Sequence, residues 1–371
     1  AGAASAAGVA LSDLDVAFAL ASDRMDINRR WTTLDASAGS ASLTGINGVT
    51  LSATNLGLVV NDGDDNRVVV DFSDNPLAVA VGGGVTRNLD IDGALGEATY
   101  VTGTMTLGVA DFFHATGTAT FSKSLGTVTL ANGQSKAVEL LTLGLANASG
   151  FAGVRNGAVN RGLTLGGVNA AYAFAADASN GNLYWNALEA TAGTVTATGL
   201  DGVTLSASNL AIEINRPNSA GDVIDWAAEP LSVSSVPEAP KLDMNGQLGA
   251  LTQASGTFAI GVNGFFEVGG SLALRRSSGS VTLADASNTT TAVDLLTIGG
   301  QGLSAFAGVN GGTANAVGFA MTGVDFALAL ASSQTDPTRK WTAVSASAAS
   351  SSFSGVPGVS LSGSNLEVRV N

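Results

Sequence analysis

Apolar and polar residues alternate with a period of two along most of this chain. The segments 16–20 (Val-Ala-Phe-Ala-Leu) and 56–60 (Leu-Gly-Leu-Val-Val) are two examples. Successive side chains of a β-strand point to opposite faces of its sheet, so this alternation is the pattern of a strand. Thr, Val and Phe, which favour strands, are frequent elsewhere in the chain. The pattern therefore predicts an all-β protein.

One strand motif recurs at fixed spacings. It consists of Gly-Φ-x-Φ, a short break and Asx-Φ-x-Φ-x-Φ, where Φ is apolar, and paired copies start 40 residues apart while successive pairs start 154 and 156 residues apart. The six copies begin at Gly8, Gly48, Gly162, Gly202, Gly318 and Gly358. This period is much longer than the roughly 20–30 residues of one coil of a parallel solenoid. Each repeat is therefore large enough to be a small domain.

The repeat predicts three units: 1–154, 155–309 and the first part of a third, 310–371. Trp31, Trp185 and Trp341 fall at matching positions. The last residue, Asn371, matches Asn61 and Asn215, so the third unit stops part-way, and we expect the chain to be a segment of a longer protein.

Turn residues indicate how neighbouring strands pair. Asn47-Gly48 and Asp201-Gly202 are signals of two-residue hairpins, whose central positions favour a positive φ. Pro357-Gly358 stands at the same place in the third unit with the residues of a type II turn. Such short turns join antiparallel strands only, so a parallel β-helix is excluded. We expect an antiparallel meander with about ten strands per repeat.

The apolar alternation slips by one residue in the middle of every copy. Val9 and Leu11 have odd numbers, whereas Leu14, Val16 and Phe18 have even numbers. A slip of one residue moves all later side chains to the other face, so it predicts a β-bulge or a strand that crosses between two packed sheets. The residues expected to adopt the irregular backbone are Asp15, Asn55, Asn169, Asn209, Asp325 and Asn365. Taken together, the patterns predict tandem antiparallel β-sandwich-like repeats stacked into an elongated rod.

Composition narrows the classes of partner. Charged residues are only 12% of the chain and the formal net charge is −14, which argues against nucleic acid, because phosphates require Lys and Arg. No run of about 18 apolar residues predicts a membrane span. There is no cysteine, hence no disulfide framework. A surface of small, uncharged residues favours contacts between copies of the chain.

The sequence does not predict an enzyme. His114 is the only histidine, Glu267 stands at its place in the second repeat, and there is no cysteine, so the chain contains no Ser-His or Cys-His nucleophile pair. No phosphate-binding loop of the GxxxxGK[ST] type is present either.

One acidic loop is a candidate calcium site. Asp62, Asp64 and Asn66 have the alternate spacing of oxygen ligands in calcium loops. The second repeat has Arg216-Pro-Asn218 at this place, which could not bind calcium in that way. The alternative is an ordinary solvated acidic turn.

Some segments resemble a known class of proteins. They are Gly-Val-Thr-Leu-Ser-Ala-Ser-Asn-Leu (202–210), Val-Asp-Leu-Leu-Thr-Ile-Gly (293–299) and Phe-Ala-Gly-Val (306–309). Their residue pattern resembles that of the tandem repeats in giant secreted bacterial proteins of the RTX-like or large-adhesin type. The resemblance covers essentially the whole chain, and it implies a place at the cell surface or in the extracellular matrix, calcium-rich surroundings and type I secretion. The calcium-binding nonapeptide GGxGxDxΦx is absent.

Three functions therefore stand as hypotheses. The first is a non-enzymatic extracellular structural protein: a filament, matrix or adhesin-stalk segment whose partners are copies of itself. The second is an adhesion or glycan-binding module that acts through the variable loops 22–30, 61–66, 178–184, 216–222 and 333–340. The third is a lipid carrier, which requires large apolar residues to line a continuous groove.

Overall fold

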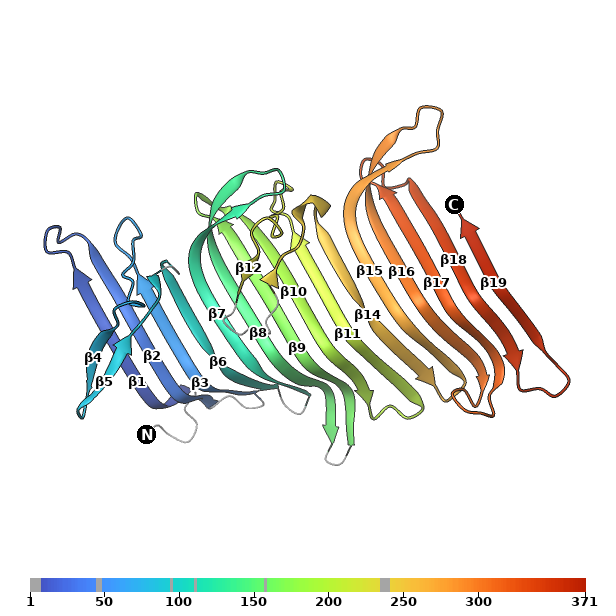
Figure 1. The fold of residues 1–371 in the computed structure, drawn as a ribbon, viewed down its shortest axis with the longest axis horizontal. Coiled ribbons are helices and arrows are strands. Elements are labelled where there is room, and N and C mark those ends of the chain that lie inside the picture. The colour runs from blue at the N-terminus through green and yellow to red at the C-terminus, as the bar shows by residue number, and fades with distance from the viewer. Residues whose placement is uncertain (1–7, 45–48, 94–95, 110–111, 157–158, 234–240) are drawn as a thin grey trace.

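The computed structural model describes residues 8–44, 49–93, 96–109, 112–156, 159–233 and 241–371. In this part of the chain the secondary structure is β, apart from short 3-10 stretches such as Gly246–Leu248 (Figure 1). The strands are β1 (Gly8–Ser22), β2 (Arg30–Thr44), β3 (Val49–Asp62), β4 (Leu77–Gly82), β5 (Val85–Leu89), β6 (Ala98–Val109), β7 (Phe113–Thr129), β8 (Ser135–Asn156), β9 (Val159–Asp177), β10 (Asn180–Thr198), β11 (Val203–Arg216), β12 (Leu231–Ser232), β13 (Lys241–Leu242), β14 (Leu251–Val262), β15 (Phe266–Thr282), β16 (Thr290–Val309), β17 (Val317–Ser333), β18 (Lys340–Ser354) and β19 (Leu361–Val370).

Fifteen of these strands form one open antiparallel sheet in the order of the chain. Each strand pairs with the previous and the next strand of the meander, while β4–β5 and β12–β13 form two small separate hairpins. Both hairpins lie in long connections, one between β3 and β6 and the other between β11 and β14. The predicted all-β antiparallel class is confirmed. The predicted sandwich is not, because the main strands of the described residues form one open sheet and not two sheets packed face to face.

The main sheet runs through both junctions between the sequence repeats. Across the first, β8 pairs with β9, from Val138–Asp177 to Asn156–Val159. Across the second, β16 pairs with β17, from Val293–Ser333 to Val309–Val317. The position 154/155 lies inside β8, whereas 309/310 coincides with the end of β16. Consecutive repeats are thus joined by main-chain hydrogen bonds along a whole strand.

Two of the predicted hairpin turns lie in the described part of the chain, and both join antiparallel strands. The two-residue form expected at Asp201-Gly202 is wrong, because residues 199–202 separate β10 from β11 and Asp201 does not have a positive φ. Gly202 has φ +72° between β10 and β11. Gly358 has φ +77°, and the N–H of Val359 donates to the carbonyl of Val356 at 3.1 Å, as in a type II turn with Pro357 at its second position. Asn47-Gly48 lies outside the described residues.

A row of irregular residues crosses the whole main sheet. On β1 to β3 it consists of Asp13, Gly39 and Asn55, which are passed over in the regular pairing. The row continues at Gly117, where the pairing of β7 with β8 shifts its register between Thr116 and Thr118. It continues also at Gly270, where the pairing of β15 with β16 shifts between Gly269 and Ser271. Residues of the row with a left-handed backbone (φ between +51° and +142°) are Asp13, Asn55, Asn147, Gly167, Asn209, Gly270, Gly302, Gly323 and Asn365. We call this row the crease.

The crease confirms the β-bulges predicted from the phase slip and corrects three of their positions. Asn55, Asn209 and Asn365 have the expected unusual backbone. Asp15, Asn169 and Asp325 do not. In those strands the left-handed residue lies two positions earlier, at Asp13, Gly167 and Gly323. Asp and Gly tolerate this conformation, and the extra residue must precede the apolar run whose phase it changes.

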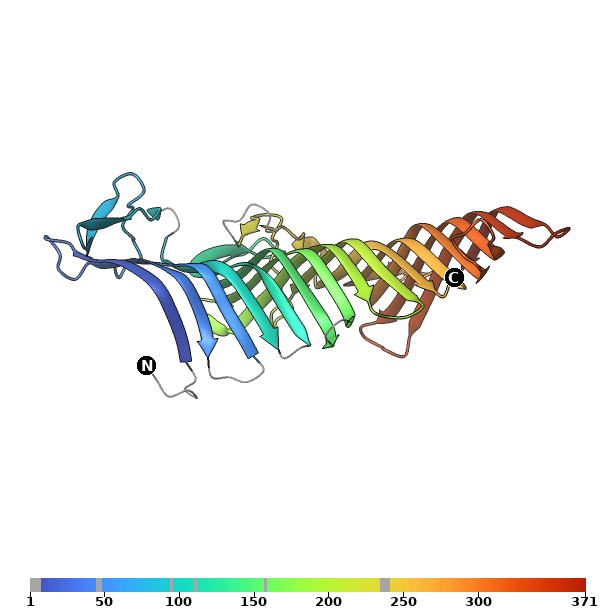
Figure 2. The same cartoon turned by 90° about the horizontal axis from the view of Figure 1, so that it is seen from below.

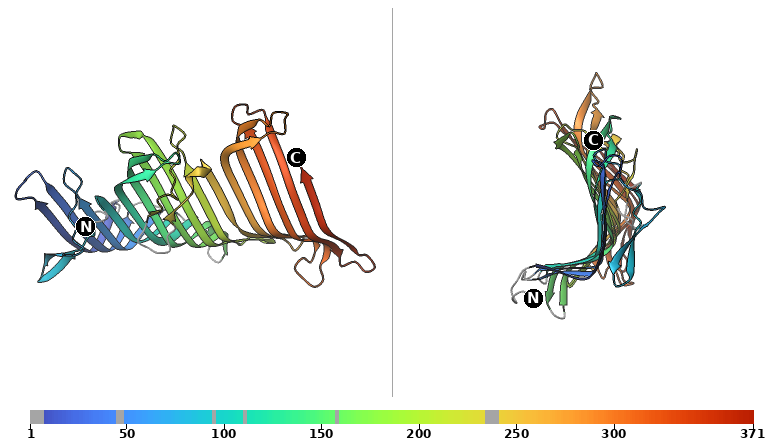
Figure 3. Two further views of the ribbon diagram at one scale, coloured as in Figure 1. Left: turned by 45° about the horizontal axis from the view of Figure 1, so that its top comes forward. Right: turned by 90° about the vertical axis from the view of Figure 1, so that its left-hand side faces the viewer.

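The sheet is bent lengthwise into two limbs, as the end-on view of Figure 3 shows. Bulges bend a sheet, so we place the bend along the crease. Because each bulge inserts one residue, the apolar positions before and after it return to the same face. Leu11 and Leu14 of β1, on either side of Asp13, therefore share a face. The long connections lie on the opposite, convex side (Figures 2 and 3).

The main core lies between the convex face and the connection from β11 to β14. The sheet contributes small residues, Ala171, Ala173 and Ala175 of β9, which are 0–1% exposed. Beside them Trp185 is 1% exposed, and Trp226 of the connection is 2% exposed. Small side chains on the sheet allow the covering segment to approach closely, so large apolar residues of the connection fill the space above them.

Candidate functional site

The concave face of the main sheet is apolar from the first strand to the last. Its residues follow from the register, since they alternate with those that contact the convex-side connections. Leu14 and Phe18 of β1 are 56% and 50% exposed. Other large, exposed apolar residues of this face are Leu11, Val16, Leu20, Leu51, Leu107, Phe121, Leu143, Leu163, Tyr184, Ile212, Ile260, Phe266, Leu274, Phe319, Leu330, Leu361, Leu366, Val368 and Val370. Such a surface is far larger than the apolar patches of ordinary monomers.

Charged residues of the concave face lie near the strand ends. Lys123 Nζ and Glu139 Oε1 form an ion pair of 3.3 Å close to the edge where β7 ends. In the described strands the register places these charged residues on this face: Arg30, Asp62, Lys123, Glu139, Arg161, Arg216, Arg276, Asp294 and Lys340. Of these nine residues only Arg161 lies toward the edge where β9 begins, and the other eight lie toward the edge where β1, β3 and β9 end. The trough, as we call the concave face, therefore has one charged rim and is apolar elsewhere.

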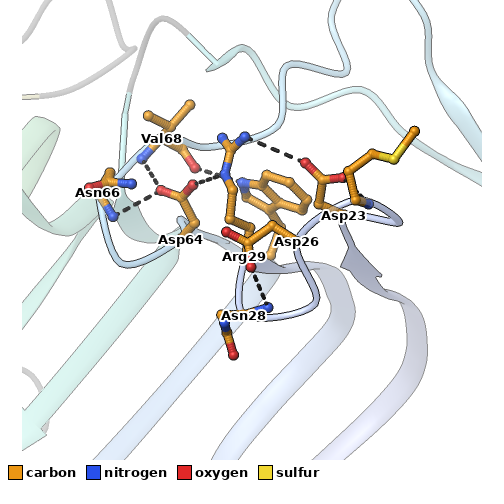
Figure 4. A network of polar contacts seen from close by, with 9 residues as sticks. Asp23, Asp26, Asn28, Arg29, Asp64, Asn66 and Val68 are labelled. Carbon is orange, nitrogen blue, oxygen red and sulfur yellow. Dashed lines mark hydrogen bonds and ion pairs between the residues drawn. The ribbon is translucent and has the colours of Figure 1, made fainter.

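A polar network at one edge surrounds the candidate calcium residue Asp64 (Figure 4). The side chain of Asp64 is fully buried and accepts a hydrogen bond from Arg29 Nε at 2.6 Å. Its other oxygen accepts the main-chain N–H groups of Asn66 and Val68, both at 3.0 Å. The hydrogen bond from Arg29, followed by that from Val68, lowers the pKa of Asp64. The carboxylate is thus ionised and satisfied by donors of its own chain.

The structure does not gather the three predicted calcium ligands around a common point. Asp62 and Asn66 are exposed, and Asn66 approaches Asp64 through its N–H, which is a donor and cannot bind a cation. In the described part of the chain no group of three acidic or histidine side chains is placed to hold a metal ion. A calcium ion at Asp64 would have to displace Arg29.

The second repeat makes the same turn without a charge. Asn218, which matches Asp64, accepts the N–H groups of Ala220 at 2.9 Å and Asp222 at 3.0 Å through its side-chain oxygen. The shared feature of the two loops is therefore an Asx side chain that orders the main chain, as in Asx turns.

Two side chains hold a covering segment against the sheet in each of the first two repeats. Trp31 Nε1 donates to the carbonyl of Val68 at 2.7 Å, and Asn61 Nδ2 donates to that of Val70 at 3.2 Å. In the second repeat Trp185 Nε1 donates to Asp222 at 3.0 Å. There Asn215 Nδ2 donates to Ile224 at 2.8 Å. Sequence comparison matched these Trp and Asn residues but gave no sign of their shared partners, which lie in connections of dissimilar sequence.

The variable loops gather at one edge of the sheet. Loops 22–30, 61–66, 178–184, 216–222 and 333–340 all follow strands that run in the same direction, so the antiparallel meander brings them to the same side (Figure 1). Adhesion through these loops stays a prediction.

A continuous apolar groove followed from the sequence only as the requirement of a lipid carrier, and its place on this face was not predicted. Its signal was present, because the phase slip and the bulge together put all large apolar residues on one side. The predicted packing of two sheets would instead have covered such a face. No helix in the described residues is long and apolar enough to cross a membrane. Comparison with known protein families finds none that matches this chain, and no curated protein sequence matches it.

Proposed function

We propose that the protein is a non-enzymatic structural element of an extracellular or cell-surface assembly, in which tandem β repeats extend a rod, filament or stalk. The observation that carries this proposal is the pairing of β8 with β9 and of β16 with β17. A repeat that adds its strands to the sheet of the previous repeat lengthens the molecule by a fixed step, as in other repeat arrays.

Copies of the chain are the partners that its surfaces fit best. The concave face is apolar, and the chain has only 12% charged residues. Large apolar faces become covered in assemblies.

Light scattering and negative-stain electron microscopy of the purified chain test this proposal. We expect elongated particles with a mass above that of one chain. Leu143→Glu puts a charge in the middle of the concave face and should reduce the mass, whereas Ser206→Glu on the convex face should not. Compact monomers that Leu143→Glu leaves unchanged would contradict assembly through this face.

A second candidate function is the binding of long apolar chains, such as the acyl chains of lipids. The observation that favours it is the continuity of the trough, whose exposed Leu, Val, Ile and Phe residues run from β1 to β19. Acyl chains gain about 0.8 kcal/mol for each buried CH₂ group, so a long trough could bind them firmly without specific polar contacts.

Mass spectrometry of material extracted from the purified protein distinguishes the two candidates. A carrier should retain lipid in stoichiometric amounts as a monomer and bind a fluorescent fatty acid less well after Leu143→Glu. A self-assembling structural protein should be free of lipid and should lose mass, not fatty-acid binding, in the same variant.

A further inference from the structure

A hollow of about 340 Å³ lies at the charged rim of the trough, over β15–β18. Its floor contains Leu296 and Leu330, which are direct partners in β16 and β17. Arg276 of β15 and Lys340 of β18 flank this floor, on strands that are three spacings or about 14 Å apart. The hollow therefore combines an apolar floor with a cation on either side.

Aromatic side chains occupy the matching place at the first repeat junction. Phe174 and Tyr184 match Leu330 and Lys340 in the sequence, and their rings stack with the centroids 5.5 Å apart. The hollow thus arises from different side chains at two positions of the sheet. The two long connections lie on the convex side (Figures 2 and 3), so they do not cross the trough in either of the first two repeats.

The two cations of the hollow have no ion-pair partner in the described part of the chain. Lys123, which matches Arg276, pairs with Glu139 at 3.3 Å. Neither Arg276 nor Lys340 forms such a pair. A negatively charged group placed between them would gain two opposite charges without having to displace an existing partner.

One carboxylate of the chain also lines the hollow. Asp294 accepts hydrogen bonds from Ser278 Oγ at 3.2 Å and from Gln334 Nε2 at 3.1 Å. The hollow therefore holds two cations against one acidic side chain, although the whole chain has a formal net charge of −14. This local excess of positive charge favours an anionic ligand.

The trough becomes fully apolar one row further inward. Leu274, Ile298, Leu328 and Val344 are direct partners across β15–β18, two residues or about 7 Å along the strands from the row of Arg276. A ligand that fits has its charge attached directly to an apolar chain, as a fatty acid has. A phospholipid would place its glycerol ester groups against this row, where they would find no polar side chain.

We propose that the hollow over β15–β18 binds the carboxylate of a long-chain fatty acid. Arg276 and Lys340 pair with the carboxylate, and the acyl chain lies in the trough along β16 and β17. A guanidinium group can donate two parallel hydrogen bonds to a carboxylate, so Arg276 also orients the head group. The proposal rests on the second candidate function, the binding of long apolar chains, and adds the head group and its place.

Isothermal titration calorimetry of the intact chain with three amphiphiles of equal tail length tests the site. Dodecanoate, dodecanol and dodecyltrimethylammonium, each below its micelle-forming concentration, carry a negative, a neutral and a positive head group. We expect one carboxylate-selective site per chain. Dodecanoate should bind there about fivefold more tightly than dodecanol, as the strength of exposed ion pairs allows, and dodecyltrimethylammonium should bind least.

Three variants locate the site. Arg276→Gln should remove the selectivity for dodecanoate and leave dodecanol binding unchanged. Lys123→Gln is the matched control one repeat earlier, where the cation is already paired, and it should keep the selectivity. Leu330→Phe combined with Lys340→Tyr rebuilds the aromatic pair of the first junction and should abolish the site, with circular dichroism confirming that the variant is folded.

The outcomes separate the carboxylate site from the function on which it rests. Equal affinity for all three amphiphiles would overturn the site and leave the binding of apolar chains standing. If none of the three binds, or if the trough is closed by a second copy, both are overturned. Selectivity that survives both Arg276→Gln and the double variant would show that the carboxylate binds elsewhere and would overturn this site.

Discussion

Single polar side chains hold distant parts of each convex-side connection together. Asp71 is one of them: through Oδ1 it accepts the N–H groups of Gly93 and Ser73 and the Ser73 hydroxyl, at 2.7–3.1 Å. Asp225, at the matching place of the second repeat, accepts the N–H of Gly246 at 2.8 Å. These acceptors, exposed at Asp71 and half-buried at Asp225, satisfy main-chain donors of connections that have little regular structure of their own.

The geometry of Asp64 predicts a response to substitution and none to calcium. Asp64→Asn keeps an acceptor for the N–H groups of Asn66 and Val68, as Asn218 does, and loses the ion pair with Arg29, so it should lower the melting temperature slightly. Asp64→Ala leaves both N–H groups without their acceptor and should lower it more. Thermal unfolding of the three proteins with calcium and with a chelator checks this. A calcium-dependent rise in melting temperature that Asp64→Asn abolishes would show that the loop binds calcium after all.

Glu189 predicts a pH dependence of stability. It lies half-buried below β13, and burial raises its pKa from 4.5 to about 7. The hydrogen bond from the N–H of Asp243 opposes this rise, while the negative charges of Asp243 and Glu213 add to it by smaller amounts. The folded state therefore holds this proton more tightly than the unfolded state, so stability falls as pH rises from about 4.5 to about 7 and is then constant. Because the side chain is half-exposed, solvent screening leaves about 1 kcal/mol of this effect.

Urea denaturation between pH 4.5 and 8 measures the contribution of Glu189. Glu189→Gln, which is neutral at every pH, should be more stable than the native chain at pH 8. Its free energy of unfolding should not show the decrease between about pH 4.5 and pH 7 that Glu189 causes. Asp243→Asn is a control for the nearby carboxyl. An unchanged pH profile in Glu189→Gln would contradict a raised pKa.

At the level of elements, the crease determines how the long strands bend. Glycine is required at positions where the neighbouring strand comes very close to the backbone beside a bulge. A Cβ on Gly117 would lie 2.5 Å from Ala148 Cβ and 2.8 Å from Ala148 Cα. The obstacle includes main chain, so a shift of one flexible side chain could not relieve it.

Substitution of crease glycines should therefore be costly. Gly117→Ala should destabilise the protein by about 2 kcal/mol, as overpacking of a tight contact does. Gly279→Ala in β15 is the matched control, because a Cβ there meets no atom within 4 Å, and its effect should be neutral or slightly stabilising. Denaturant unfolding of both variants checks the difference, and equal stabilities would mean that the crease does not hold the strands this close.

The sequence predicted the strands, their antiparallel sense and the bulges, since each of these leaves a local mark. Period-two alternation, Gly in hairpin turns and a one-residue slip are all properties of neighbouring residues. The slip did not specify the bulged residue itself, because Asp13 and Asp15 both tolerate an unusual backbone and only the pairing with β2 distinguishes them.

Long-range features could not be predicted in the same way. The apolar and polar residues of a strand alternate in the same way whether the next repeat adds to the edge of the sheet or packs on its face. The pairing of β8 with β9 therefore could not be read from the local sequence. The partner of Asp64, Arg29, lies 35 residues earlier and is brought near by a hairpin. The uncharged Asn218 at the matching place was the one available sign that the turn works without a cation.

At the level of the whole molecule, one bent sheet with an apolar trough on one side explains the composition. Low charge and abundant Ala, Ser and Gly suit a convex face that covering segments approach closely, and the large apolar residues are concentrated in the trough. This arrangement depends on strands of consecutive repeats being direct neighbours in one sheet.

Cysteine cross-linking across the first repeat junction tests that central claim most directly, because the native chain contains no cysteine. Glu139 of β8 and Ala176 of β9 are direct partners, while Tyr184 of β10 is the next partner of Ala176, one strand further away. Glu139→Cys/Ala176→Cys should form an intramolecular disulfide on mild oxidation, since paired strands lie within disulfide reach. Glu139→Cys/Tyr184→Cys should not. Failure of the first pair to cross-link, or cross-linking only between molecules, would contradict a single sheet that continues from one repeat to the next.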